Sequence, residues 1–156
     1  MAAAKAKRDV FDFLMRMGAD SSRLDDFGNN ILHFAITGKC AGIIQDIIWK
    51  GMVDINYRGE YERTALMDVA KYGDRNIFAL LVKKGALTNL VDCNGHNILH
   101  IAVKGNNTDM VRYILSQSII DIKARDKSGK TAAMIAKIYG FHRFHTLLSE
   151  KGCPLR

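Results

Sequence analysis

One short phrase recurs along the chain at nearly constant spacing. Its clearest copy reads Asn97-Ile98-Leu99-His100-Ile101-Ala102, and related copies begin at Asn30, Thr64 and Thr131. The intervals between the opening polar residues are 34, 33 and 34 residues (64−30, 97−64 and 131−97). A fixed period in this range is typical of proteins whose units bury their apolar faces only by stacking on one another. The spacing therefore predicts a stacked array of similar units.

A turn motif precedes three of the four copies. Asp25–Asn29, Asp92–His96 and Asp126–Lys130 have the form Asp-x-x-Gly-x, whereas Gly59–Arg63 departs from it at the Asp and Gly positions. Together, phrase and turn resemble the ankyrin repeat, whose period is about 33 residues and whose signature is T-P-L-H-x-A. No copy has the family's proline; the residues in its place are Ile31, Ala65, Ile98 and Ala132. The resemblance implies an all-α solenoid of stacked helix–turn–helix units with β-turn arms.

The resemblance covers nearly the whole chain and makes it a single domain, residues 1–156. The expected units are a half repeat at 2–24 and full repeats at 25–58, 59–91, 92–125 and 126–156. The half repeat is predicted to be a helix over 2–17, with an apolar stripe at helical spacing formed by Val10, Phe11, Leu14 and Met15. Such an opening suits either a piece of a longer array or a natural N-terminal cap, and the sequence leaves both open.

The polar residue that opens each copy is expected to cap the helix that follows. Its side-chain oxygen can accept a hydrogen bond from an amide of the first helical turn, which has no partner within the helix. These residues are Asn30, Thr64, Asn97 and Thr131. His33 and His100 share one place in the repeat, and this recurrence favours a structural role. In ankyrin repeats, the corresponding histidine hydrogen-bonds between neighbouring turns.

The net charge of +7 is concentrated at the C-terminal end of the chain. From Lys123 to Arg156 there are eight basic residues and two acidic ones, Asp126 and Glu150, so this stretch contributes 8−2, or +6. Such a field favours an acidic partner: an acidic protein segment, nucleic acid or an anionic membrane surface. A terminal repeat also needs a polar outer face, so a solvated end cap explains the same charges.

Cysteine usage and hydropathy indicate an intracellular setting, cytoplasmic or nuclear. Cys40, Cys93 and Cys153 are odd in number and widely spaced, which argues against a disulfide framework or a zinc knuckle. No apolar run reaches the length that spans a bilayer. The N-terminus also lacks the apolar core of a secretory signal.

No combination of residues points to catalysis, to a metal or to a cofactor. Ser128-Gly129-Lys130-Thr131 resembles the end of a phosphate-binding loop, but the first glycine of that motif would fall at Ala124. His142 and His145 could touch one metal ion, yet no further ligand has suitable spacing. We therefore expect a protein that is not an enzyme and has no catalytic residues, metal site or cofactor.

The resemblance to ankyrin repeats instead implies a protein-binding module that uses its concave face, where turn tips and first helices are exposed. The expected partner-binding residues are Phe27, Asn29, Tyr61, Arg63, Lys71, Tyr72, His96, Lys104, Lys127, Lys130 and Tyr139. Aromatic residues and arginine are enriched at interface hot spots, which favours Phe27, Tyr61, Arg63 and Tyr72. For Phe27 the alternative is packing against the preceding half repeat.

Two narrower functions remain as alternatives. Short ankyrin chains resemble the inhibitors of Rel-type transcription factors (IκB-like), although those usually end in an acidic tail and this chain ends basic. The other alternative is binding of nucleic acid or anionic lipid through the basic last repeat, which predicts a steep dependence on salt. The main expectation is a monomer that binds another protein, with an acidic segment of that protein facing the basic end.

Overall fold

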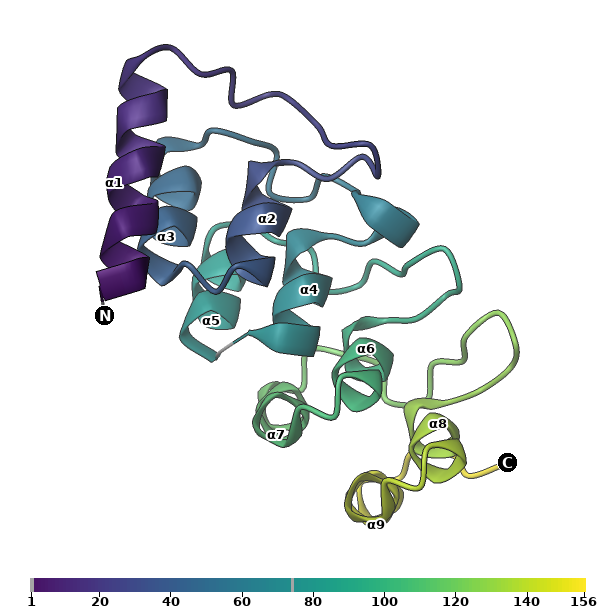
Figure 1. The fold of residues 1–156 in the computed structure, drawn as a ribbon. Helices are drawn as coiled ribbons and strands as arrows, with labels where there is room; N and C mark the ends of the chain where they lie inside the picture. Colours follow the sequence, from purple (N-terminus) through teal and green to yellow (C-terminus); the bar gives the residue numbers. More distant parts are fainter. Residues whose placement is uncertain (1, 74) are drawn as a thin grey trace.

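The computed structural model describes residues 2–73 and 75–156, with side chains from residue 7 onward. Over these residues the regular structure is helical, and the helices form two rows (Figure 1). The inner row contains α2 (Ile31–Thr37), α4 (Ala65–Tyr72), α6 (Ile98–Lys104) and α8 (Ala132–Ile138). The outer row contains α1 (Ala2–Arg16), α3 (Ala41–Lys50), α5 (Arg75–Lys83), α7 (Thr108–Gln117) and α9 (His142–Glu150). The predicted all-α repeat fold is confirmed.

Extended arms carry the chain from each outer helix to the next inner helix (Figure 1). The turn in every arm is closed by the same backbone hydrogen bond, such as Asp92 N to His96 O at 3.0 Å and Asp126 N to Lys130 O at 2.9 Å. Neighbouring turns are joined by further bonds, from Cys93 N to Tyr61 O and from Lys127 N to Asn94 O, both at 2.9 Å. The arms therefore form a ladder alongside the inner helices.

The second arm keeps this turn although its sequence departs from the motif. Its closing bond runs from Gly59 N to Arg63 O at 2.9 Å, and Glu60–Glu62 form a short 3₁₀ helix, η1. Tyr61 and Glu62 both have φ of 57°, a left-handed conformation that is uncommon for residues other than glycine. A Cβ atom at Gly59 would collide with Asn29 Oδ1, which accepts from Glu60 N at 2.9 Å, so the close approach of two arms favours glycine there.

Three of the four predicted helix caps are confirmed. Asn30 Oδ1 accepts from the amides of the first turn of α2, and Asn97 Oδ1 does the same for α6. Thr131 Oγ1 accepts from Met134 N at 3.3 Å and donates to Pro154 O at 2.6 Å. The prediction is wrong for Thr64, whose buried Oγ1 has no hydrogen-bond partner among the described residues. Only its backbone has the extended geometry of a cap.

The difference between the two threonines leads to a first test. Replacing Thr131 with valine keeps the shape but removes both hydrogen bonds, so we expect the free energy of unfolding to fall by about 1–2 kcal/mol. The same substitution at Thr64 removes an unpaired buried hydroxyl, so stability should stay unchanged or rise. Urea denaturation of both variants measures the difference, and equal losses would contradict the two hydrogen-bonding patterns.

The two recurrent histidines join consecutive repeats, as expected. His33 Nε2 lies 3.1 Å from the Arg63 carbonyl, and His100 Nε2 lies 3.1 Å from the Lys130 carbonyl. Because a carbonyl oxygen only accepts, each Nε2 carries the proton and donates. Burial lowers the pKa of His100, although the hydrogen bond to Lys130 opposes this shift. These contacts hold each arm at a fixed distance from the inner helix before it.

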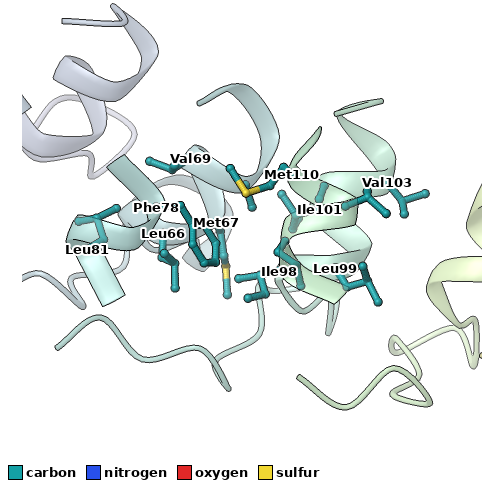
Figure 2. Packing of buried hydrophobic residues seen from close by; sticks show 14 of the residues in the cluster. Leu66, Met67, Val69, Phe78, Leu81, Ile98, Leu99, Ile101, Val103 and Met110 are labelled. Atoms are coloured by element: carbon teal, nitrogen blue, oxygen red, sulfur yellow. The ribbon is translucent and has the colours of Figure 1, made fainter. Parts of the chain in front are cut away.

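Apolar side chains fill the space between the rows and run continuously through the stack. Figure 2 shows buried side chains of α4 and α5, such as Leu66, Met67 and Phe78, turned toward those of α6 and α7. Large residues dominate this layer, and Phe78 and Ile114 are almost fully buried. Since no helix here buries its apolar stripe alone, each repeat depends on the next for its core.

Helix α1 covers Ala2–Arg16, close to the helix predicted over 2–17, and only part of its apolar stripe is buried. Within the stripe, Phe11 and Met15 are half-buried, whereas Val10 and Leu14 are exposed. The reason is that α1 contacts mainly α3, to which Arg8 is tied by an ion pair of 2.6 Å with Asp46. Val10 and Leu14 therefore leave apolar surface of α1 exposed.

Candidate protein-binding surface

Two grooves open on the face formed by the inner helices and the arms. The first, the aromatic groove, lies between the first two full repeats and has a volume of about 290 Å³. It is lined by Asp25, Phe27, Asn29, His33, Phe34, Thr37, Glu60, Arg63, Asp68 and Tyr72. The second, the lysine groove, lies between the last two repeats and has a volume of about 480 Å³. It is lined by Asn94, His96, Lys104, Asp126, Lys127, Ser128, Lys130, Ile135, Ile138 and Tyr139.

The grooves collect nine of the eleven residues that the sequence suggested for partner binding. Phe27, Asn29, Arg63 and Tyr72 line the aromatic groove. His96, Lys104, Lys127, Lys130 and Tyr139 line the lysine groove. Tyr61 and Lys71 lie outside both: Tyr61 is exposed beside Arg63, and Lys71 Nζ lies 4.4 Å from the ring centroid of Tyr72. Whether any of these residues contacts a partner stays a prediction.

Phe27 stands out from the protein surface. Its side chain is 68% exposed, so the alternative in which it packs against the half repeat is wrong. The turn that holds it is fixed by Asp25, whose Oδ1 accepts from Phe27 N at 3.0 Å and from Asn29 N at 2.7 Å. A rigid turn with a projecting aromatic ring can bind without losing much conformational entropy.

His96 differs from the expected exposed tip residue, because it is buried between two carboxylates. Its Nδ1 donates to Asp92 Oδ2 at 3.0 Å, and its Nε2 lies 3.5 Å from Asp126 Oδ2. Lys104 Nζ is 3.3 Å from the same Nε2. The imidazole therefore links two successive arms beneath the lysine groove, and its edge forms part of the groove floor.

The carboxylates in this network are held in the charged form. Burial raises the pKa of Asp92, but hydrogen bonds from the backbone and ring of His96 outweigh it, and the net pKa is below the usual value. Asp126 behaves alike, with burial opposed by hydrogen bonds from Lys130 and Ser128. Arg63 Nε lies 3.5 Å from Asp92 Oδ2. Arg63 thus lines the aromatic groove while its charge is directed toward the buried aspartate.

Comparison with known proteins assigns this arrangement to a family. A family model described as ankyrin repeats (3 copies) matches residues 1–92 and residues 66–155. The chain belongs to the ankyrin-repeat family. Ankyrin repeats bind other proteins, and membership of this family indicates that the chain is a protein–protein interaction module.

Its relatives carry ankyrin repeats in different settings. A putative ankyrin repeat protein of Acanthamoeba polyphaga mimivirus is 30% identical over 134 residues, which cover 83% of this chain and 80% of that protein. A palmitoyltransferase of Lachancea kluyveri is 33% identical over 113 residues, which cover 70% of this chain and 15% of the enzyme. Neurogenic locus notch homolog protein 2 of Homo sapiens is 29% identical over 115 residues, which cover 74% of this chain and 5% of that protein. The ankyrin chain thus spans a small part of the latter two.

Sequence reasoning missed two groove residues that comparison of the ankyrin repeats could have found. Phe34 and Asp68 stand four residues after the opening polar residue, where the other two copies have Ile101 and Ile135. Both isoleucines are buried, whereas Phe34 is 54% exposed and Asp68 is half-buried in the groove. A repeat position that is apolar in some copies and charged in another indicates that its side chain is buried in some repeats and lies at the surface in others.

The features that the sequence analysis set aside have structural places in the ankyrin fold. Ser128–Thr131 form the turn and cap of the last repeat, where Asp126 Oδ1 accepts from Ser128 N and Lys130 N. Among the described residues, no group of His, Cys, Asp and Glu has the arrangement to hold a metal ion. Cys40, Cys93 and Cys153 are free thiols in this structure. Within the described helices, none is long and apolar enough to cross a membrane.

Proposed function

We propose that this ankyrin chain binds an extended segment of a partner protein along the face that contains both grooves. The exposure of large apolar side chains within the grooves carries the proposal. Phe27 and Phe34 are exposed at the aromatic groove, and Ile138 and Tyr139 are exposed at the lysine groove. Exposed apolar side chains that gather beside polar groups mark interaction sites.

The charge of the lysine groove indicates what part of the partner it receives. Lys127 is exposed, and Lys130 donates to Ser128 Oγ at 2.8 Å, which places its ammonium at the rim. The acidic member of the lining, Asp126, is buried and already accepts from its own turn. The unpaired charge of the rim is therefore positive, and an acidic segment with an apolar side chain facing Ile138 fits it best.

The lysine rim supplies the test of this function. Partners would be isolated from cell extract at low and high salt, with nuclease in one arm, and the affinity of a purified protein partner would then be measured. We expect the double variant Lys127→Ala/Lys130→Ala to weaken binding about tenfold at low salt and to reduce the salt dependence, since rim charges act mainly by steering.

The control removes the same charge from the opposite row of helices. Lys83→Ala/Arg112→Ala changes two exposed residues of α5 and α7, and it should leave the affinity unchanged. Equal losses in both double variants would mean that total charge matters and not the groove. Loss of the captured material on nuclease treatment would favour the nucleic-acid alternative, for which the basic last repeat is the relevant surface.

A further inference from the structure

The lining of the aromatic groove includes a carboxylate, that of Asp68, which has neither a hydrogen-bond donor nor a paired cation among the described residues. Asp68 of α4 is half-buried and makes no hydrogen bond or ion pair with any described residue. Burial raises the pKa of Asp68, although the positive charges of His33, Arg63 and Lys71 partly oppose this. A desolvated carboxylate without a donor destabilises the fold. Its presence in an open groove therefore indicates a role that another molecule completes.

The cationic groups near Asp68 are engaged elsewhere. Arg63 lies 3.5 Å from Asp92 through Nε, and its guanidinium carbon is 5.2 Å from the ring centroid of Tyr61. The ammonium of Lys71 lies over the ring of Tyr72. His33 uses both ring nitrogens, at 2.8 Å from Asn30 Oδ1 and at 3.1 Å from the Arg63 carbonyl. None of the three is in direct contact with the carboxylate of Asp68.

The rest of the lining favours a cation. Glu60 adds a second carboxylate that has no partner among the described residues, and it further raises the pKa of Asp68. Three exposed aromatic rings border the same groove, those of Phe27, Phe34 and Tyr72. Aromatic faces attract cations, and a planar guanidinium both stacks on a ring and donates two parallel hydrogen bonds to a carboxylate.

We propose that the aromatic groove receives an arginine side chain of the partner segment, with its guanidinium on Asp68 and its stem against the aromatic rings. The inference rests on the proposed function, because it assigns a second chemical feature to the same partner. The partner segment then carries opposite charges at the two grooves: a basic side chain at the aromatic groove and acidic side chains at the lysine groove. The order of these charges along the partner fixes the direction in which the segment lies.

Short peptides test the pocket without the natural partner. Three probes, acetyl-Gly-Ser-Xaa-Ser-Gly-amide with arginine, citrulline or lysine at Xaa, would be titrated into the isotope-labelled protein and followed by NMR. We expect the arginine peptide to shift the side-chain signals of Asp68 and Phe34 and to bind about fivefold more tightly than the citrulline peptide, which has nearly the same shape but no charge. Lysine should bind more weakly than arginine, because its ammonium is strongly hydrated.

Two aspartate variants provide the matched comparison. Asp68→Asn should abolish the preference for arginine over citrulline, whereas Asp26→Asn, an exposed change outside the groove lining, should keep it. Because burial raises the pKa of Asp68 in the folded state, its ionisation costs stability as the pH rises from the unfolded-state pKa through the folded-state pKa, and the full cost is present at higher pH. Asp68→Asn should therefore raise the thermal midpoint at pH 7, and a lowered midpoint would overturn the premise that the carboxylate has no partner.

The outcomes separate this inference from the proposed function. Equal binding of arginine and citrulline peptides, or an arginine preference that survives Asp68→Asn, overturns the arginine pocket. Equal binding of lysine and arginine overturns the assignment to a guanidinium. In either case, a partner whose affinity still falls with Lys127→Ala/Lys130→Ala keeps the protein-binding function. The affinity of the partner could instead be unchanged by Lys127→Ala/Lys130→Ala while the peptides still show a preference for arginine. That result would support the arginine pocket and contradict the proposal of an acidic segment at the lysine groove.

Discussion

Phe78→Ala is expected to lower the free energy of unfolding by about 3–5 kcal/mol. Phe78 is 1% exposed, and its ring packs edge-to-face against Tyr113 of the next repeat at a centroid distance of 5.7 Å. Removing the ring leaves a cavity between two repeats, since the surrounding helices can relax into the space only in part. Chemical denaturation monitored by circular dichroism measures the loss.

A phenylalanine on α1 provides the control. Phe13 is 55% exposed, so Phe13→Ala should change the free energy of unfolding by less than about 0.5 kcal/mol. The Phe78 variant should also broaden the unfolding transition, because weakening one interface lets the two halves of a repeat array unfold separately. A loss of under about 1 kcal/mol at Phe78 would contradict the continuous core between α5 and α7.

Asp92→Ala is expected to have the second largest effect, a loss of about 3 kcal/mol in the free energy of unfolding. Asp92 Oδ1 accepts from Asn94 N and from His96 N, both at 2.9 Å, and Oδ2 accepts from His96 Nδ1. The same oxygen lies 3.5 Å from Arg63 Nε, a buried donor that has no other partner among the residues described. The substitution therefore leaves buried donors from two arms unsatisfied at once.

The pH dependence of stability checks the cause. The folded-state pKa of Asp92 lies below its unfolded value, so its contribution is present above the unfolded pKa and is lost as the pH falls toward the folded pKa. Asp92→Ala should therefore lose less stability than the parent protein between pH 7 and pH 3, while Asp126 retains its own dependence. Asp26→Ala, at an exposed site, should follow the parent curve. An unchanged acid slope in the Asp92 variant would rule out an ionised carboxylate as the source of the effect.

The fold could be predicted from the sequence because its determinants are local and repeat. The caps at Asn30 and Asn97, the turn that begins at Asp92 and the histidine contacts all depend on residues within one unit or at the same place in the next. Thr64 shows the limit of this reasoning. It has the right residue type and backbone for a cap, but its buried hydroxyl has no hydrogen-bond partner within the described part of the chain.

The candidate site was predictable only in part, because its character arises between repeats. His96 reads as a tip residue within its own unit, yet Asp126 of the following arm helps to bury it. Arg63 belongs to the arm before and points to Asp92. Phe34 and Asp68 occupy a repeat position that is isoleucine in the last two repeats. Only the stacked repeats show that both side chains line the same groove. A single-unit template therefore identifies where the surface lies but not which side chains it displays.

The contacts between elements have a consequence for how the chain acquires its structure. Each helix packs mainly on its own partner and on helices of the adjoining repeats, and the histidine bonds that cross between units span 30 residues. Proteins dominated by such short-range contacts close only small loops on the way to the native state, and they fold fast. Synthesis on the ribosome proceeds from the N-terminal end, so the preceding repeat has already emerged when the next one does. Each new repeat can therefore dock on its neighbour as soon as it emerges. The array can thus grow stepwise during translation, and no contact between its distant ends is needed to complete it.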